Sequence, residues 1–453
     1  MNCAMKKLST LLFLFISFFV HAQVWEAKTL PLASPQFGLF IDAPTSNAAW
    51  MATEGGDFSQ CPWIFDAEQN TFCKTADGEN WTCGTYPTNG SSILTSISAL
   101  DANRAYFSLY DFASGSKIIK TIDGGQTWTD ENVHFSIWVE FVHAFASDFA
   151  IGMGDPDTLG FDIHIILNAQ WIRIDPANPA KVPANLPGEW PWPFHAVEGN
   201  NLWCVTNYGR VLHTGNTGFN WEAWNGPEQT SPDAIACHGN VCLITYSACD
   251  SLTGDNAFRL WRTTDKGLNW ENLTPVDNHY TAQQMRYIPG TGVVMAALRG
   301  NNATGPFKTI VSYDNGDTWE VIDEGTPLME IGFFNSHVGW ATEYEVGGAP
   351  TRMFKYAGSP FVDGTSEHHS LDAEVSISPN PTTRVTRVSV QGEAPSDYTL
   401  TISDAFGRVI RREMIENQSS FEKSVDLNTV PAGVYWVNIS DGQRSACSKI
   451  IKE

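Results

Sequence analysis

Two octets decide the fold that this sequence predicts, Thr121-Ile-Asp-Gly-Gly-Gln-Thr-Trp128 and Ser312-Tyr-Asp-Asn-Gly-Asp-Thr-Trp319. Both place a hydroxyl residue, an aspartate, a glycine and a tryptophan at the same spacing. Thr263–Trp270 keeps the aspartate, glycine and tryptophan, Thr214–Trp221 has asparagine in place of the aspartate, and Thr75–Trp81 is one residue shorter. A motif that recurs along a chain in this way indicates a repeat architecture.

The tryptophans that end these octets give the period of the repeat. With a degenerate copy at Trp171, the steps are 47, 43, 50, 49 and 49 residues between Trp81, Trp128, Trp171, Trp221, Trp270 and Trp319. Each unit consists of short β-branched and aromatic runs broken by Gly, Asn, Asp and Pro, and no helical periodicity competes. The sequence therefore predicts an all-β fold built of four-stranded propeller blades.

The two ends of the repeat region predict how the ring closes. After six units, Met329–Tyr356 supplies three more strands and lacks a fourth. Val24–Leu30 is similar to the strand that follows the octet in other units, such as Asn269–Leu273. We therefore predict a seven-bladed β-propeller over residues 23–358, closed by its N-terminal strand, which removes two open sheet edges.

The aspartates of the octets are predicted to form turns and not to carry chemistry. A carboxylate can accept backbone N–H bonds inside a tight turn, glycine can adopt positive φ, and tryptophan can pack between blades. Asn216 supports this interpretation, because an amide organises a turn but is a poor acid or cation ligand. The predicted structural residues are Asp77, Trp81, Asp123, Trp128, Asn216, Trp221, Asp265, Trp270, Asp314 and Trp319.

The octets resemble the Asp-box, or BNR repeat, S/T-x-D-x-G-x-T/N-W, which is best known from sialidases. In that family the box is the hairpin between the third and fourth strands of a blade. A weaker resemblance, carried by Gly154-Asp-Pro156, Leu186–Glu189 and Tyr287–Thr291, is to bacterial exported propellers related to photosystem assembly factors. The resemblance implies a propeller with Asp-box hairpins.

Sialidase activity would imply an arginine triad, a tyrosine nucleophile with a glutamate partner, and an acidic proton donor. An F/Y-R-I-P motif is expected near the first blade of such enzymes, but the most similar string here is Met285-Arg-Tyr-Ile-Pro289, in the sixth unit and in altered order. The first hypothesis is a non-catalytic protein that presents a ligand-binding face. A carbohydrate-active, sialidase-like hydrolase is the alternative.

The first 22 residues have the pattern of a secretory signal peptide. Lys6 and Lys7 precede the apolar run Leu11–Val20, and small residues follow at Ala22. No later segment approaches the roughly 20 apolar residues of a transmembrane helix, so no transmembrane segment is predicted.

A different module is predicted after a polar linker at residues 359–372. Residues 373–453 carry Ser378-Pro-Asn-Pro381, Asp404–Arg408, Val430-Pro-Ala-Gly-Val-Tyr435 and Lys449-Ile-Ile-Lys452, in that order. This resembles the C-terminal sorting domain of type IX secretion substrates of Bacteroidetes, predicted here as a small β-sandwich. The resemblance implies recognition by the type IX machinery and a secreted or cell-surface protein that first enters the periplasm.

The composition limits the partners. The chain has 50 acidic and 27 basic side chains, a formal charge of −23, which repels a phosphate backbone, so nucleic acid is not an expected partner. No histidine or cysteine spacing is typical of a metal site, and neither metal nor cofactor is expected. A monomer is expected. Cys237 and Cys242 flank a two-residue turn, which leaves open a disulfide or two buried thiols.

Candidate ligand-binding residues lie in the loops expected opposite the Asp-box turns. Exposed tryptophan beside carboxylates suits sugar rings and hydroxyls, although the same residues could merely cover the end of the propeller. A glycan or a protein is therefore the expected ligand. The candidates are Trp63, Asp155, Asp157, Glu189, Trp190 and Trp192.

Overall fold

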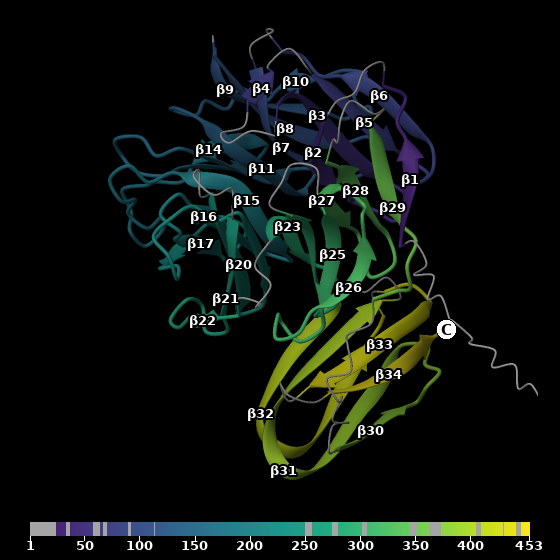
Figure 1. Ribbon diagram of the computed structural model, residues 1–453. Helices are drawn as coiled ribbons and strands as arrows, with labels where there is room; N and C mark the ends of the chain where they lie inside the picture. Colours follow the sequence, from purple (N-terminus) through teal and green to yellow (C-terminus); the bar gives the residue numbers. More distant parts are fainter. Residues whose placement is uncertain are drawn as a thin grey trace, which may run out of the picture.

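The computed structural model consists of strands and turns in the residues that it describes, without a helix (Figure 1). Residues 1–22, the predicted signal peptide, and Trp63 lie outside the described ranges. These ranges are 24–32, 37–57, 64–66, 70–88, 92–112, 114–249, 256–273, 280–300, 306–344, 351–361, 373–404, 409–428, 430–440 and 445–453.

Within these ranges, residues 25–356 form seven antiparallel sheets, each with a path of four strands. The first contains β2 (Phe37–Asp42), β3 (Ala49–Asp57), β5 (Thr71–Thr75) and β6 (Trp81–Thr85), with β4 (Ile64–Asp66) beside β3. The second and third contain β7 (Ser92–Ala99), β8 (Ala105–Asp111), β9 (Gly115–Thr121), β10 (Thr129–Asp130), and β11 (Val139–Ala146), β12 (Phe149–Gly154), β13 (Asp162–Leu167), β14 (Gln170–Arg173).

The remaining four of these sheets repeat the same up-and-down order. They contain β15 (Pro191–Glu198), β16 (Asn201–Thr206), β17 (Val211–Thr214), β18 (Glu222–Trp224); β19 (Ala234–His238), β20 (Val241–Cys249), β21 (Asn256–Thr263), β22 (Glu271–Asn272); β23 (Tyr280–Tyr287), β24 (Val294–Gly300), β25 (Phe307–Ser312), β26 (Glu320–Glu324); and β27 (Leu328–Phe333), β28 (Gly339–Glu343), β29 (Arg352–Tyr356), β1 (Trp25–Thr29).

The first strand of each sheet contacts the first strand of the next, and the contacts form a closed circle. The circle runs β2, β7, β11, β15, β19, β23, β27 and back to β2. Figure 1 labels six of these strands, β2, β7, β11, β15, β23 and β27, toward the middle of the ring, with β1, β6, β14 and β22 toward its edge. The residues of the first strands therefore surround a common axis.

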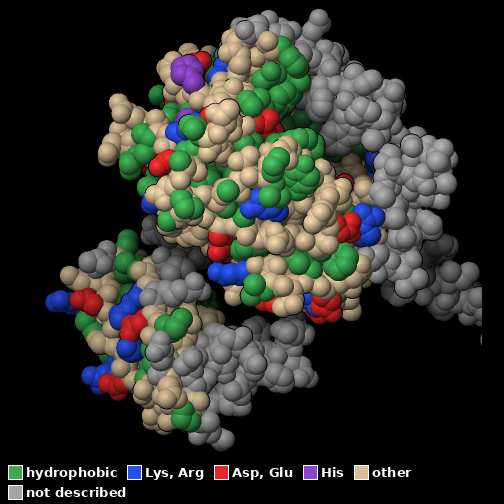
Figure 2. All heavy atoms as spheres, turned by 90° about the vertical axis from the view of Figure 1, so that its left-hand side faces the viewer, with side chains coloured by type: hydrophobic (Ala, Val, Ile, Leu, Met, Phe, Trp, Pro, Cys, Tyr) green, Lys and Arg blue, Asp and Glu red, His purple; other side chains and the backbone are tan. Residues whose placement is uncertain are grey.

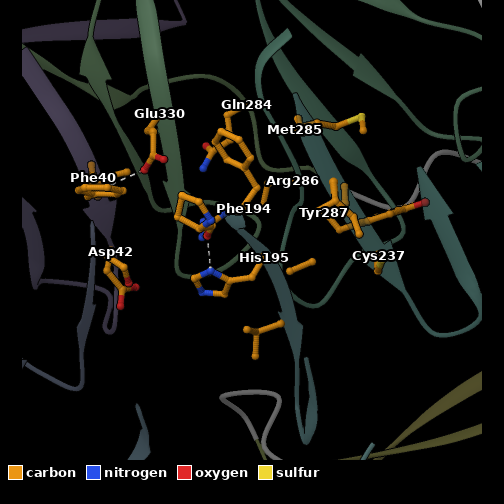
Figure 3. A pocket seen from close by; sticks show the side chains of 18 of the residues that line it. Phe40, Asp42, Phe194, His195, Cys237, Gln284, Met285, Arg286, Tyr287 and Glu330 are labelled. Atoms are coloured by element: carbon orange, nitrogen blue, oxygen red, sulfur yellow. Dashed lines mark hydrogen bonds between the residues drawn. The ribbon is translucent and has the colours of Figure 1, made fainter. Parts of the chain in front are cut away.

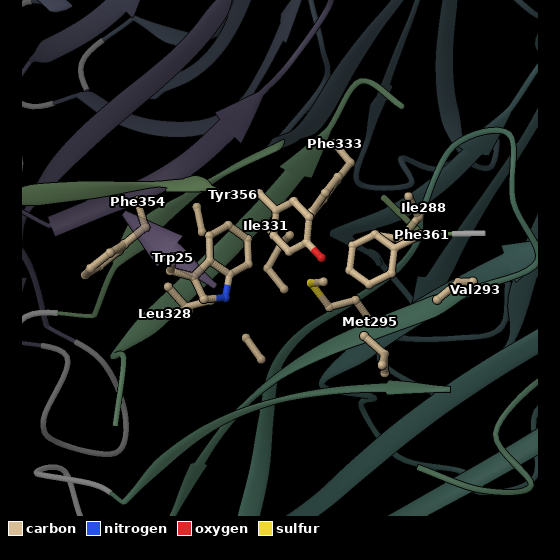
Figure 4. Close-up of a cluster of buried hydrophobic side chains, with 13 residues drawn as sticks. Trp25, Ile288, Val293, Met295, Leu328, Ile331, Phe333, Phe354, Tyr356 and Phe361 are labelled. Atoms are coloured by element: carbon tan, nitrogen blue, oxygen red, sulfur yellow. The ribbon is translucent and has the colours of Figure 1, made fainter. Parts of the chain in front are cut away.

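The N-terminal strand closes the last sheet. β1 pairs antiparallel with β29, with Trp25 opposite Tyr356 and Thr29 opposite Arg352. Trp25 is fully buried in a cluster between the sixth and seventh sheets that includes Phe333, Tyr356 and Phe361 (Figure 4). Residues far apart in the sequence thus share one core. The β1–β29 pairing leaves neither of the two facing strand edges without hydrogen-bond partners.

The octets form the turns between third and fourth strands. Asp314 accepts hydrogen bonds from the Thr318 backbone nitrogen (2.9 Å), the Thr318 hydroxyl (2.6 Å) and the Ser312 hydroxyl (2.8 Å). Ser312 Oγ in turn accepts from the nitrogen of Gly316, which has a φ of 92°. Asn216 Oδ1 takes the equivalent bond from the Asn220 nitrogen, at 2.9 Å.

Hydrogen bonds of the same kind occupy the other octet aspartates. Asp123 accepts from the Thr127 nitrogen, Asp265 from the Asn269 nitrogen, and Asp77 from the nitrogens of Glu79 and Asn80. These bonds stabilise the ionised carboxylates and lower the pKa values of Asp77, Asp123 and Asp265.

Two disulfides join directly opposed residues of neighbouring strands. Cys237 pairs with Cys242 across β19 and β20, and Cys73 with Cys83 across β5 and β6. Cys204 is a buried free thiol.

The C-terminal residues form a separate five-stranded sheet with its own buried cluster. Its strands are β30 (Ala373–Ser378), β31 (Val385–Asp404), β32 (Val409–Asp426), β33 (Gly433–Ser440) and β34 (Ser445–Lys452). The long β31 pairs with β30 in its first half, with β33 in its second half and with β32 along most of its length. The Asn380 side chain donates to the Lys449 carbonyl and accepts from the Ile451 nitrogen, which holds β34 against the segment after β30.

Candidate functional site

A cavity of about 150 Å³ lies on the common axis, lined by residues of all seven first strands. Its polar side chains come from six of these strands, β7 contributing Ser96, and from the residue before β19; several of them are labelled in Figure 3. They include Asp42, His143, His195, Asp233, Gln284, Arg286 and Glu330.

The alternation of β23 explains how polar residues reach the cavity. Met285 and Tyr287 belong to the buried cluster between the fifth and sixth sheets. Gln284 and Arg286 alternate with Met285 and Tyr287 along the strand. Side chains of successive strand residues point to opposite faces, so Gln284 and Arg286 point toward the axis. Gln284 Oε1 accepts the Ile331 backbone N–H, which fixes its amide against β27.

Arg286 is the central charge of the cavity. Its half-buried guanidinium has no hydrogen-bond or ion-pair partner among the described residues. Its positive charge nevertheless acts on Asp42, Glu330, His143 and His195, which come from four other strands. A guanidinium has five N–H donors, so this one is available to a ligand.

Two carboxyl groups lie within the field of Arg286. Glu330 Oε2 accepts the Ile41 nitrogen at 3.2 Å, and Asp42 Oδ2 accepts the Ala99 nitrogen at 2.7 Å. Burial raises the pKa of Glu330 to about 7, although Arg286 and the Ile41 bond oppose that rise. Burial also raises the pKa of Asp42. Glu330 is therefore partly protonated near neutral pH.

The two cavity histidines are neutral near neutral pH. Burial lowers the pKa of His195 to about 4 and that of His143 to about 3, and the Arg286 charge adds to both effects. His195 Nδ1 donates to the Pro193 carbonyl at 2.8 Å, and the ring stacks on Phe141. Its Nε2 is consequently the unprotonated nitrogen, a hydrogen-bond acceptor.

The candidate carboxylates from the sequence do not line the cavity, and each has its own partner: Asp157 with Arg173, Glu189 with Arg210, and Asp155 with Glu140. Glu189 is only 3% exposed, and its Oε2 accepts from Arg210 (2.7 Å) and from the Leu186 nitrogen (2.8 Å). Asp157 makes two bonds to Arg173, at 2.8 and 3.0 Å, which lower its pKa.

Asp155 is half-buried and hydrogen-bonded to the buried Glu140. Burial raises the pKa of Asp155 to about 6 and that of Glu140 well above its usual value. Two carboxyl groups in contact favour sharing one proton, because two negative charges at that distance repel each other.

Of the two described candidate tryptophans, Trp190 lies just before β15 and Trp192 lies within it. Trp190 is 41% exposed just before β15. Trp192 is half-buried, packs on the cluster around Trp203 and donates its indole N–H to Ser231 Oγ at 3.2 Å. The next residues of β15, Pro193 and Phe194, line the cavity. Trp190 and Trp192 therefore precede the cavity-lining residues of β15 along the chain, and neither lines the cavity itself.

The sequence interpretation did not assign a role to Arg286, Glu330, Asp42 or His195. Arg286 belongs to the string Met285–Pro289, which resembles a sialidase motif in altered order but does not by itself indicate a position in a cavity. The sequence carries a signal for Glu330, which is a single charged residue inside the otherwise apolar first strand Met329–Phe333.

Several basic side chains of the propeller pair with carboxylates, among them Arg173 with Asp157, Arg259 with Glu228 and Arg352 with Glu343. On the face shown in Figure 2, acidic and basic side chains lie among hydrophobic ones, and no single charge dominates. Among the described residues, no group of three or more His, Cys, Asp and Glu side chains could hold a metal ion. Across the same ranges, no helix has the length and apolar character needed to cross a membrane.

Comparisons with known proteins identify the C-terminal module and the propeller separately. Residues 376–453 match the family described as the secretion system C-terminal sorting domain. No curated protein matches the sequence. These C-terminal residues therefore indicate export through the type IX secretion system.

Solved structures resemble the larger part. YCF48 bound to D1 peptide has a TM-score of 0.51 and 15% identity, over 75% of this chain and 96% of that chain. YCF48 from Cyanidioschyzon merolae has a TM-score of 0.49 and 15% identity, over 73% and 98%. PorZ of the type IX secretion system of Porphyromonas gingivalis has a TM-score of 0.32 and 14% identity, over 94% and 70%. The fold is a β-propeller.

Proposed function

We propose that this exported protein is a seven-bladed propeller, over residues 23–358, that binds a neutral, hydroxyl-rich ligand such as a sugar in its central cavity. The observation that carries the proposal is the Arg286 guanidinium, which has no hydrogen-bond or ion-pair partner among the described residues and acts on the carboxyl groups of Asp42 and Glu330. Residues 373–453, after a linker at 359–372, would form a sandwich that serves export.

A hydroxyl group both donates and accepts hydrogen bonds, and the cavity offers both kinds of partner. Arg286 donates, the carboxylates accept, and His195 Nε2 accepts because its other nitrogen is protonated. A strongly anionic ligand would face Asp42 and Glu330, whereas a cation would face Arg286. A neutral polar ligand can form hydrogen bonds with Arg286, with the carboxyl groups and with His195 without placing a net charge near either kind of group.

Two tryptophans next to the cavity-lining part of β15 extend the proposed site. Trp190 and Trp192 precede the cavity-lining residues of β15, and an indole face can stack on a sugar ring. We propose that they contact the part of the ligand that projects from the cavity. The neighbouring Asp155, Asp157 and Glu189 would then hold the supporting loops through their bonds to Glu140, Arg173 and Arg210.

The test is a glycan-array screen of the purified protein, followed by calorimetric titration of the best glycan with Arg286→Ala. We expect at least a tenfold loss of affinity and an unchanged melting temperature. Arg104→Ala is the matched control, because Arg104 pairs with Asp101 at the surface. The proposal is wrong if no glycan binds, or if Arg286→Ala binds as wild type does. YCF48 was solved with a peptide, so a peptide array run in parallel identifies that competing ligand class.

Glu330 favours glycoside hydrolysis as a second candidate. A carboxyl group with a pKa of about 7 can remain protonated and act as a general acid, and Asp42 supplies a second carboxyl group that acts electrostatically on it. Incubation with a panel of nitrophenyl glycosides tests this function. Turnover that Glu330→Gln abolishes would support it, and turnover that survives the substitution would exclude Glu330 as the acid.

A further inference from the structure

The C-terminal sheet places parts of two motifs side by side on its solvent face. Trp436 follows Val430–Tyr435, and Lys449 begins the terminal Lys449–Lys452 motif. The two residues are directly opposite in the β33–β34 pair. Directly opposite residues of antiparallel strands project from the same face.

This face is exposed where those two residues lie. Trp436 is 42% exposed, while its strand neighbours Tyr435 and Val437 are buried in the core of the sheet. Lys449 is exposed, and Ile450 beside it is buried. The core therefore fixes which side the indole and the ammonium group face, and packing within the domain does not explain an exposed tryptophan there.

The charge of Lys449 is uncompensated. Other described basic side chains of this domain have partners: Arg384 with Asp426, Arg387 with Glu422, Arg411 and Lys423 with Glu413, and Lys452 with the Val430 carbonyl. The Lys449 ammonium has neither an ion pair nor a hydrogen bond among the described residues of the chain. An uncompensated cation beside an indole fits a partner surface that is apolar and carries a carboxylate.

We propose that Trp436 and Lys449 form the docking surface by which the export machinery recognises this domain, through an apolar protein surface bearing an acidic residue. The proposal rests on export through residues 376–453, the range that matches the sorting-domain family. The backbone of β34 is already held by β33 and by Asn380, so the domain presents these two side chains on a fixed frame.

The experiment expresses the full chain in a type IX-competent host and measures the fraction that reaches the medium or cell surface. We expect Trp436→Ala and Lys449→Glu each to reduce that fraction at least fivefold, and Lys449→Arg to retain it. Arg387→Glu is the matched control, since it makes the same charge change at an exposed residue in the first half of β31. Thermal melting of each purified variant should match wild type within a few degrees.

Three outcomes would overturn the proposal. Normal export of both Trp436→Ala and Lys449→Glu removes the docking role. An equal loss with Arg387→Glu shows a general charge effect. Conversion of a dimer to a monomer by Trp436→Ala in sedimentation assigns the surface to a second copy of the chain. Deletion of residues 373–453 tests export itself: if the deletion blocks export and the point variants do not, only the docking surface is wrong.

Discussion

Trp25 lies directly opposite Tyr356, and the centroids of their rings are 5.4 Å apart in an edge-to-face arrangement. This contact joins the first described strand to the last strand of the ring. Trp25 also meets Phe333 edge to face, at 6.1 Å. The closure of the propeller therefore depends on an aromatic core built by residues more than 300 positions apart.

We expect Trp25→Ala to lower the free energy of unfolding by about 3–5 kcal/mol, because it empties a fully buried aromatic site. Urea unfolding followed by tryptophan fluorescence measures the change. Trp190→Ala is the control, since that side chain is 41% exposed, and it should cost far less. Equal effects of the two substitutions would mean that β1 does not close the ring.

The Asp314 turn should tolerate asparagine better than alanine. Asp314→Asn keeps an oxygen for the Thr318 nitrogen and should cost about 0.5–1.5 kcal/mol, the usual contribution of one hydrogen bond. Asp314→Ala loses every bond of the side chain and should cost more. Urea unfolding gives both values, and ligand binding should be unchanged in both variants. A loss of binding without a loss of stability would assign Asp314 to a functional site.

The Glu189–Arg210 pair should be costly to break from one side. Arg210→Ala leaves a buried carboxylate without its partner, and we expect a loss of about 3–5 kcal/mol. The double variant Glu189→Gln with Arg210→Ala should lose less, because no buried charge remains. A double-mutant cycle in urea reports the difference. An additive result would show that the two side chains do not interact.

The contribution of two buried carboxyl groups to stability should fall as the pH rises from about 4 to about 7, whereas His143 and His195, whose pKa values are lowered in the folded protein, contribute the opposite trend up to about pH 6.5. Burial holds the pKa values of Glu330 and Asp233 at about 7, above the unfolded values near 4, so the unfolded chain releases these protons first. Each such group lowers the unfolding free energy by up to about 1.4 kcal/mol per pH unit across that window. Below the unfolded pKa values their contribution is fully present.

Glu330→Gln is the variant that isolates one of these groups. Compared with wild type, it should lose only the decline that Glu330 contributes between pH 5 and pH 7, because Asp233 and the histidines still titrate. Chemical denaturation at several pH values measures the slopes. A slope identical to that of wild type would place the titrating groups elsewhere.

Much of the fold could be predicted from the sequence, because it depends on interactions between residues that are close along the chain. The order of residues in Ser312–Trp319 is sufficient for a turn, because its hydrogen bonds join residues two to four positions apart. Alternating apolar runs predict strands by the same local argument. The sorting domain is readable because its motifs occur in a fixed order, and the type IX export that they predicted is supported by the family match.

The candidate site was not readable in this way. Asp42, Arg286 and Glu330 are separated by up to 288 residues, and only the circular packing of first strands brings them to one cavity. Burial is likewise a tertiary property: Glu189 lies among proline, glycine and tryptophan in a segment that reads as an exposed loop, yet it is buried against Arg210. The sequence by itself determined the strands, the turns and the export module, because these depend on neighbours along the chain. The tertiary structure decided which polar groups lose water and face one another, since desolvation and charge interactions depend on neighbours in space.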